Sequence, residues 1–247
     1  VVGGDGSLRE TLAGLGDAMG RVEVGLIPIG NANVVARELG IPLDPEAALA
    51  ALATPANLQA VPLDVGYAHS ELFLAGVGIG WDAVAVDYLD RLRRTRLGRI
   101  WYRRWADSTY AVVGVLAMLR LRWPRFSVRA DGQRLDRVFY GAHFCNCRTY
   151  AKGWSMTPDA DSRSGWLHYQ LRKRSLIPFL VWHLLAAMLR RKAPRFISSY
   201  GTARKICVEG ERPFGVQVDG DHRGTMQRLE LEIRPAAARM LVPRSAG

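Results

Sequence analysis

The chain has few of the features that identify several common protein classes. Its 247 residues include three cysteines and no Cys-x-x-Cys pair. The cysteines are Cys145, Cys147 and Cys207. This spacing argues against a disulfide framework, and His143 does not complete a metal site with them, so we expect reduced, structural thiols in a cytosolic protein. The most apolar run, residues 176–189, is too short to span a bilayer and predicts a core or interfacial helix.

Acidic residues are also scarce. The 34 Lys and Arg outnumber the 23 Asp and Glu, for a formal net charge of +11, which favours an anionic partner. The imbalance is greatest in residues 91–129, where eleven arginines and several aromatic residues accompany Asp107 as the one acid. Two interpretations of this stretch stay open, a solvated face or a contact with an anionic membrane. No nucleic-acid reading motif is found in it, so nucleic acid is not expected as a partner.

The first residues form a glycine-rich turn after an apolar pair. Val1-Val2 leads into Gly3-Gly4-Asp5-Gly6-Ser7, and apolar residues then recur at helical spacing from Leu8 to Met19. Glycines allow positive φ and let backbone N–H groups approach an anion, and a helix N-terminus favours phosphate. The pattern predicts a strand, a phosphate-binding loop and a helix, although an ordinary tight turn remains the alternative.

A second unit of the same kind follows. Residues 22–29 predict a strand, Gly30-Asn31-Ala32-Asn33 a loop, and residues 34–39 a short helix. We expect the two loops to lie side by side at one edge of a parallel sheet, because both follow strands and precede helices. Such a loop normally belongs to a larger βαβ unit, so we also expect further strands and helices upstream of residue 1 in the whole protein.

Beyond these units the pattern changes to strands interrupted by helices. Strands are expected at residues 58–65, 71–79, 125–130, 133–144, 166–172, 205–209, 214–218 and 228–234. Helices are expected at about residues 43–56, 88–97, 106–121 and 176–192. The sequence therefore predicts an α/β layer in residues 1–65 and a mostly antiparallel β domain with inserted helices in residues 66–234.

The order of the motifs resembles a known family, the diacylglycerol kinase catalytic-domain family, which includes bacterial lipid kinases and sphingosine kinases. The motifs are Gly3-Gly4-Asp5-Gly6-Ser7, the loop and helix start at 28–37, Gly76-Val77-Gly78-Ile79-Gly80-Trp81-Asp82-Ala83, Asn146, Gly153, Pro158-Asp159-Ala160, Gly165 and Val218-Asp219-Gly220-Asp221. The resemblance covers the whole chain, but the N-terminal portion of the family is absent. It implies a truncated NAD-kinase-like α/β nucleotide domain and a β-sandwich-like lipid domain, with residues 235–247 returning to the first.

The resemblance also implies a reaction. An ATP-dependent lipid kinase, with Mg²⁺, would transfer the γ-phosphoryl of ATP to a lipid hydroxyl, with diacylglycerol as the default acceptor and a sphingoid base left open. The protein would be cytoplasmic and peripheral at the inner face of an anionic membrane, and homo-oligomerisation stays open. Two alternatives remain: a catalytically weak lipid- or nucleotide-binding homologue, and a kinase of NAD or a sugar phosphate.

Roles for individual residues come from the same resemblance. ATP phosphates would be held by Gly3, Gly4, Asp5, Gly6 and Ser7, and the nucleotide also by Gly30, Asn31 and Asn33. Asp5 would act through Mg²⁺ or orient the acceptor, and Asp82 would lie near the acceptor, with a turn aspartate as its alternative.

Asp221 stands where the family has glutamate, and would be the base that removes the proton of the acceptor hydroxyl. A plain hairpin turn is the alternative interpretation of Asp219-Gly220. The shorter side chain must be placed about 1 Å nearer, and misplacement of that size costs about 10²-fold in rate. We expect the carboxylates of Asp5, Asp82 and Asp221 to face one cleft.

Overall fold

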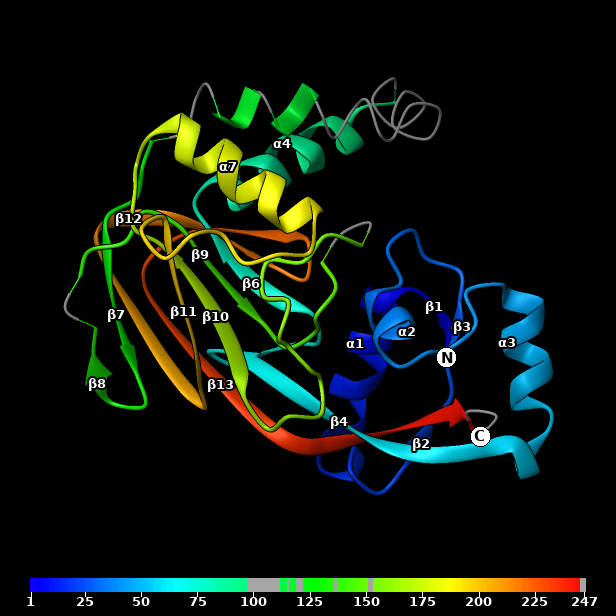
Figure 1. The fold of residues 1–247 in the computed structure, drawn as a ribbon. Coiled ribbons are helices and arrows are strands. Elements are labelled where there is room, and N and C mark those ends of the chain that lie inside the picture. Colours follow the sequence, from blue (N-terminus) through cyan, green and yellow to red (C-terminus); the bar gives the residue numbers. More distant parts are fainter. Residues whose placement is uncertain (97–111, 115, 119–121, 136, 151–152, 245–247) are drawn as a thin grey trace.

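The computed structural model describes residues 1–96, 112–114, 116–118, 122–135, 137–150 and 153–244 (Figure 1). The first part of the chain forms a small α/β layer. Its elements are β1 (Val2–Gly3), α1 (Asp5–Leu15), a 3-10 turn (Gly16–Ala18), β2 (Glu23–Val24), β3 (Ile27–Pro28), α2 (Val34–Glu38), α3 (Pro45–Leu52) and a second 3-10 turn (Pro55–Asn57). β1 and β3 pair in parallel as a two-stranded sheet.

The rest of the chain is dominated by one large sheet. Its elements are β4 (Leu58–Ala68), β5 (Glu71–Phe73), β6 (Gly76–Ile79), α4 (Trp81–Arg94), β7 (Phe126–Ala130), β8 (Gln133–Arg134), β9 (Ala142–Cys145), β10 (Leu167–Arg172), α7 (Ile177–Met188), β11 (Ser198–Ala203), β12 (Lys205–Val218) and β13 (Asp221–Pro243). The order along the sheet is β11-β10-β9-β6-β12-β13-β4-β5, with β7 and β8 added beside β12 and β2 beside β13. All pairs are antiparallel except β2 with β13.

Several expected strands are divided differently in the structure. The strand expected at 22–29 is two strands, because β2 pairs with β13 whereas β3 pairs with β1. The strand expected at 71–79 is also two, β5 and β6, because the N–H groups of Leu74 and Ala75 between them donate to the Asp219 carboxylate. A periodic apolar pattern reports burial and does not report which strand is the partner.

Other expected strands are merged or divided in the structure, and one observed strand was not expected. The stretch 133–144 holds β8 and β9 with a loop between them, whereas 205–209 and 214–218 belong to the single strand β12 with a register shift. The expected strand 228–234 is the middle of β13, which has 23 residues. β11 lies in a serine- and glycine-containing segment and was not expected from its sequence.

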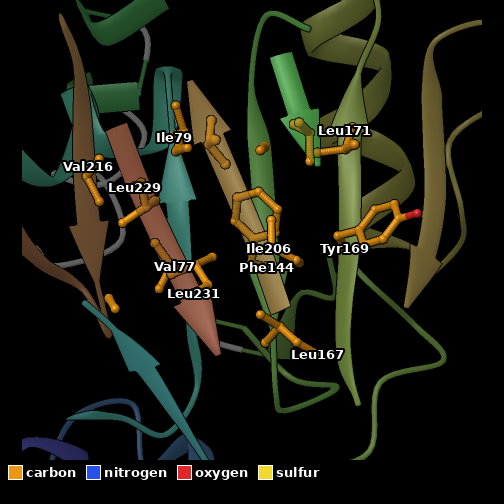
Figure 2. Packing of buried hydrophobic residues seen from close by; sticks show 14 of the residues in the cluster. Val77, Ile79, Phe144, Leu167, Tyr169, Leu171, Ile206, Val216, Leu229 and Leu231 are labelled. Atoms are coloured by element: carbon orange, nitrogen blue, oxygen red, sulfur yellow. The ribbon is translucent and has the colours of Figure 1, made fainter. Parts of the chain in front are cut away.

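Two hydrophobic cores lie along the sheet. The larger packs side chains from β6, β9, β10, β12 and β13, as Figure 2 shows with Val77, Phe144 and Leu231 among the labelled residues. The smaller packs α1, α2 and α3 against β4 and the last part of β13, where Ala238, Met240 and Val242 are buried. This arrangement is compatible with the expected division at 1–65, 66–234 and 235–247, which stays an interpretation.

Helices α4 and α7 lie together above one end of the large sheet (Figure 1). They share a buried cluster that includes Leu180 and Leu184 of α7 and draws in Trp81 and Val84 of α4. None of the helices in the described ranges is long and apolar enough to cross a bilayer. All three cysteines have free thiols, and burial raises the pKa of Cys145 to about 12, which suits a structural role.

Candidate functional site

The two glycine-containing loops meet at the carboxyl ends of β1 and β3. The parallel register places Gly3 opposite Pro28, and both loops leave the sheet at this end. A Cβ on Gly30 would lie 2.6 Å from the Cα of Gly4, so the two backbones touch and a side chain at Gly30 does not fit. The prediction that the loops are adjacent at one edge of a parallel sheet is confirmed.

None of the glycines of the first loop has a positive φ, which corrects our expectation, and Gly3 and Gly4 are needed because a side chain would not fit there. Gly4 has φ −98°, and the positive-φ glycines of the described residues lie elsewhere. A Cβ on Gly3 would meet the Ser7 hydroxyl at 2.5 Å, whereas a Cβ on Gly6 would meet nothing within 4 Å. Gly6 therefore leaves open surface over the first turn of α1.

That first turn is suited to an anion. Gly4 is the N-cap of α1 and offers no side-chain cap, while its carbonyl accepts the Leu8 N–H at 3.1 Å. The N–H groups of Asp5, Gly6 and Ser7 have no acceptor within the helix, as in any first turn. Such groups and the helix dipole together favour phosphate.

Asp5 joins the two loops. Its Oδ2 accepts the N–H of Val34 at 2.9 Å and its Oδ1 accepts the N–H of Val35 at 3.0 Å, so it holds the start of α2. Asn33, the buried N-cap of α2, has φ 47° and donates from Nδ2 to the Gly30 carbonyl at 2.8 Å. Asn31 is exposed beside it.

These contacts bear on the expected magnesium ion. Both oxygens of Asp5 are already bound by backbone N–H groups, and across the described ranges His, Cys, Asp and Glu form no group of three that could hold a metal ion. The expected role of Asp5 towards Mg²⁺ stays a prediction.

Asp219 is a structural clamp. Its buried carboxylate accepts the N–H groups of Leu74 at 2.8 Å, Ala75 at 2.8 Å and Gly76 at 3.0 Å. Burial raises the pKa of Asp219, and the three N–H bonds partly oppose that rise. The clamp fixes the β12–β13 turn against the segment between β5 and β6.

Asp221, two residues later, is half exposed and held by arginines. Arg9 of α1 donates to its Oδ2 at 2.8 Å, and Arg223 approaches the same oxygen at 3.2 Å while pairing with Glu71. Arg9 lies one helical turn after Asp5, so this ion pair connects α1 to the turn that carries Asp221. Both guanidinium groups bind Oδ2, and the Asp221 side chain is 49% exposed.

Asp82 lies beneath this turn and is buried. It accepts the Tyr150 hydroxyl at 2.7 Å and the Nε2 of Gln217 at 2.7 Å. The Oε1 of Gln217 in turn accepts the N–H of Gly220 at 2.7 Å. Asp82 therefore acts on the turn through Gln217, as a positioning residue.

The glycines before Asp82 have a direct purpose. A Cβ on Gly78 would collide with the Asp82 carboxylate and lie 2.7 Å from the Nε2 of Gln217. Gly80, with φ 96°, turns the chain from β6 into α4. The Gly-Val-Gly-Ile-Gly-Trp-Asp segment therefore leaves room for one buried, hydrogen-bonded carboxylate.

A cluster of buried polar side chains continues from Asp82 towards α7. His143 approaches Asp82 at 3.6 Å and the Oε1 of Gln170 at 3.1 Å, and it stacks on His183 of α7 with ring centroids 5.9 Å apart. Together with Arg172 these residues line a cavity of about 10 Å³, which is about the size of one water molecule. Burial lowers the pKa of Arg172 to about 9.

This cluster makes the stability of the protein sensitive to acid. Burial lowers the pKa of His143, and lowers that of His183 well below 6.5, with Arg172 adding to both shifts and Asp82 opposing the one at His143. Below pH 6.5 the unfolded chain therefore binds protons that the folded chain does not. We expect the free energy of unfolding to fall by up to about 1.4 kcal/mol per pH unit for each histidine as the pH decreases.

Urea unfolding between pH 7.5 and pH 5 measures this effect. His183→Leu should flatten the pH dependence, whereas His69→Gln, at an exposed position, should leave it unchanged. Equal slopes for the parent and His183→Leu would contradict the assignment.

The structure thus gathers some expected residues and separates others. The two loops and Asp221 lie around α1, whereas Asp82 is buried and bound by Tyr150 and Gln217, in contrast with our expectation that it faces one cleft with Asp5 and Asp221. Sequence reasoning missed Arg9 and Gln217, because neither lies in a motif and both act over more than a hundred residues of chain. A large part of the stretch 91–129, which includes residues 97–111 and 119–121, lies outside the described residues, so its expected membrane contact stays a prediction.

Residues 1–68 match the family model described as the diacylglycerol kinase catalytic domain. A "probable lipid kinase YegS-like" protein of Pseudomonas aeruginosa is 44% identical over 72 residues, which are 29% of this chain and 22% of that protein. The diacylglycerol kinase of Bacillus subtilis is 27% identical over 232 residues, covering 92% of this chain and 71% of that protein.

The fold is similar to that of a solved structure. The crystal structure of a diacylglycerol kinase from Bacillus anthracis matches with a TM-score of 0.65 at 17% identity, covering 100% of this chain and 76% of that one. The expected resemblance and the expected fold class are both confirmed by these findings. The match to the Pseudomonas protein spans less than a quarter of its length.

Proposed function

We propose, with this likeness to the diacylglycerol kinase catalytic domain as the premise, that the protein is an ATP-dependent lipid kinase. The observation that carries the proposal is the ion pair between Arg9 and Asp221, because it joins an anion-binding helix start to a half-exposed carboxylate. A nucleotide domain and an acceptor domain need such a meeting point. Diacylglycerol is the default acceptor, and a sphingoid base is the second.

The proposed mechanism divides the work among the described residues. Backbone N–H groups at the start of α1 hold the phosphates of ATP, which arrives with Mg²⁺, and the loop from Gly30 to Asn33 completes the nucleotide site. Asp221 accepts the proton of the lipid hydroxyl. The hydroxyl oxygen of the lipid attacks the γ-phosphorus in line, and ADP leaves. Asp5, Asp82 and Asp219 hold the two loops and the turn in place, so positioning supplies much of the rate.

Transfer of radiolabel from [γ-³²P]ATP tests the reaction. The full-length gene product is incubated with vesicles containing dioleoylglycerol, with sphingosine, with NAD and with a sugar phosphate in separate reactions. Label in phosphatidic acid supports the proposal. Label in NADP or in a sugar bisphosphate alone favours a kinase of NAD or of a sugar phosphate. Saturable ATP binding without any transfer favours a catalytically weak homologue. The shorter aspartate at position 221, where the family has glutamate, would be consistent with such a weak homologue.

Gly6 offers a sharper test of the phosphate loop. Because an added Cβ meets nothing within 4 Å, Gly6→Ala should not destabilise the fold and should raise the free energy of unfolding by up to about 1 kcal/mol. The same methyl group would occupy the surface that the phosphates approach, so the KM for ATP should rise at least about tenfold.

Gly14→Ala is the matched control. Gly14 lies in the same helix, and a Cβ there also meets nothing within 4 Å, but it is far from the first turn. Both variants should be equally stable, and Gly14→Ala should keep the ATP affinity of the parent. If Gly6→Ala binds ATP with the affinity of the parent, the proposal that this loop holds the phosphates is wrong.

A further inference from the structure

Helix α7 has an apolar surface on its outer side. Its exposed residues, called here the α7 face, are between 40% and 69% exposed. They are Leu176, Ile177, Val181, Trp182, Leu185, Met188 and Leu189. On the opposite side of the same helix, Leu180, His183 and Leu184 are buried against the sheet and α4. One side of the helix therefore packs against the protein, and the opposite side is apolar as well although it is exposed.

Such a surface is unusual on a protein that stays in water. A helix that is apolar all round is normally covered, and large exposed apolar patches mark sites of interaction. The patch extends beyond the helix, because Phe196 is 50% exposed and packs edge-on against Trp182 with ring centroids 5.8 Å apart. The exposed apolar area is thus contiguous.

The chain on both sides of α7 is rich in positive charge. Residues 162–208 contain ten Lys and Arg and no Asp or Glu. Lys173 and Arg174 stand before the helix, and residues 190–192 and Arg195 stand after it. Lys173 lies close to other positive charges. Burial lowers its pKa, and the nearby Arg137, Arg195 and Arg174 lower it further. Lys192 is paired with Asp159. The other basic residues on the two sides of the helix are called here the basic rim: Lys173, Arg174, Arg190, Arg191 and Arg195.

We propose that the α7 face and its basic rim dock on the surface of an anionic lipid bilayer. Trp182 and Leu185 enter the boundary between headgroups and acyl chains, and the rim binds the lipid phosphates. The purpose of this docking rests on the proposed function, because a lipid acceptor resides in that bilayer. A second copy of the chain fits less well, since two α7 faces packed together would bring two basic rims against each other.

Vesicle co-sedimentation without ATP tests the docking. The parent protein should bind vesicles of phosphatidylcholine with about one third phosphatidylglycerol, and binding should weaken with added salt, because the attraction of the rim is screened. Leu185→Gln should weaken the partition about tenfold by removing inserted apolar surface. Leu49→Gln is the matched control, because Leu49 is 56% exposed on α3, away from the patch, and it should bind as the parent does.

Charge variants test the rim separately. Arg191→Gln with Arg195→Gln should weaken binding to the anionic vesicles by at least about tenfold at low salt and should change binding to pure phosphatidylcholine little. Arg212→Gln, at an exposed position on β12, controls for the loss of positive charge. Equal binding of the parent to neutral and anionic vesicles would overturn the role of the rim.

The outcomes separate the docking from the kinase reaction. Leu185→Gln should phosphorylate the short-chain dioctanoylglycerol in solution at the parental rate and lose turnover on dioleoylglycerol in vesicles. Vesicle binding by Leu185→Gln equal to that of the parent overturns the docking, even if lipid is phosphorylated. Docking without any phosphorylation overturns only the kinase. A parent that sediments as a dimer, with Leu185→Gln monomeric and vesicle binding unchanged, assigns the α7 face to a second copy and also overturns the proposal.

Discussion

Asp221→Asn is expected to lower the turnover of lipid phosphorylation by roughly 10²–10⁴-fold, because asparagine keeps the shape of the side chain and cannot accept the proton. The ATP affinity should hardly change, since Asp221 addresses the acceptor. Asp221→Glu should retain or raise activity if the geometry of the family is intact, because it restores the longer side chain. Steady-state kinetics with varied ATP and varied acceptor measure both effects.

Glu71→Gln is the matched control for the ion pairs around Asp221. It removes the other carboxylate that Arg223 binds and leaves Asp221 in place, so turnover should fall little. If Asp221→Asn and Glu71→Gln lose activity equally, the loss comes from the network of arginines. Full turnover in Asp221→Asn on every lipid that the parent phosphorylates would make the turn a structural hairpin, with Asp5 the next candidate.

Asp219→Ala is expected to lower the free energy of unfolding by about 3–5 kcal/mol. Three backbone N–H groups lose their acceptor at once, and each buried donor without a partner costs about 1–3 kcal/mol before water reaches it. Activity should also be lost, because the turn that carries Asp221 is no longer fixed. Urea unfolding followed by circular dichroism measures the change.

Asp131→Ala is an internal standard for this prediction. Asp131-Gly132 has nearly the same backbone as Asp219-Gly220, with φ values of 48° and 82° against 49° and 82°. Its carboxylate also accepts two backbone N–H groups, from Arg204 and Lys205, but it is exposed, so water can replace it. We expect a loss of about 1 kcal/mol there, and an equal loss at both positions would show that the Asp219 clamp is not special.

The sequence predicted the parts of the fold that local patterns encode. The two strand–loop–helix units and the apolar helix α7 were visible because their turn residues and apolar spacing lie within a few positions of each other. The pairing of β2 with β13 and the break between β5 and β6 were not visible. In each case the decisive contact comes from a residue more than a hundred positions away, such as Asp219 for the N–H groups of Leu74 and Ala75.

The same limit applies to the candidate site. Motif order indicated the loops and the three aspartates, but only the structure shows what each carboxylate contacts. Asp5 and Asp82 look alike in sequence as acids in glycine-containing segments, yet Asp5 accepts the first N–H groups of α2 and Asp82 accepts Tyr150 and Gln217 in a buried network. Arg9 carries no local signal at all, because its partner Asp221 is 212 positions away.

The course of β13 determines whether the two halves of the protein can be separated as independent fragments. Its early residues belong to the larger core and pair with β12, whereas Ala238, Met240 and Val242 complete the smaller core beside β4. A gene fragment that ends before residue 238 would leave the smaller core without one wall, even though its helices α1, α2 and α3 are present. The two halves are therefore not interchangeable modules, and a chimera that exchanges the half with the larger core must keep the end of β13 together with the smaller core.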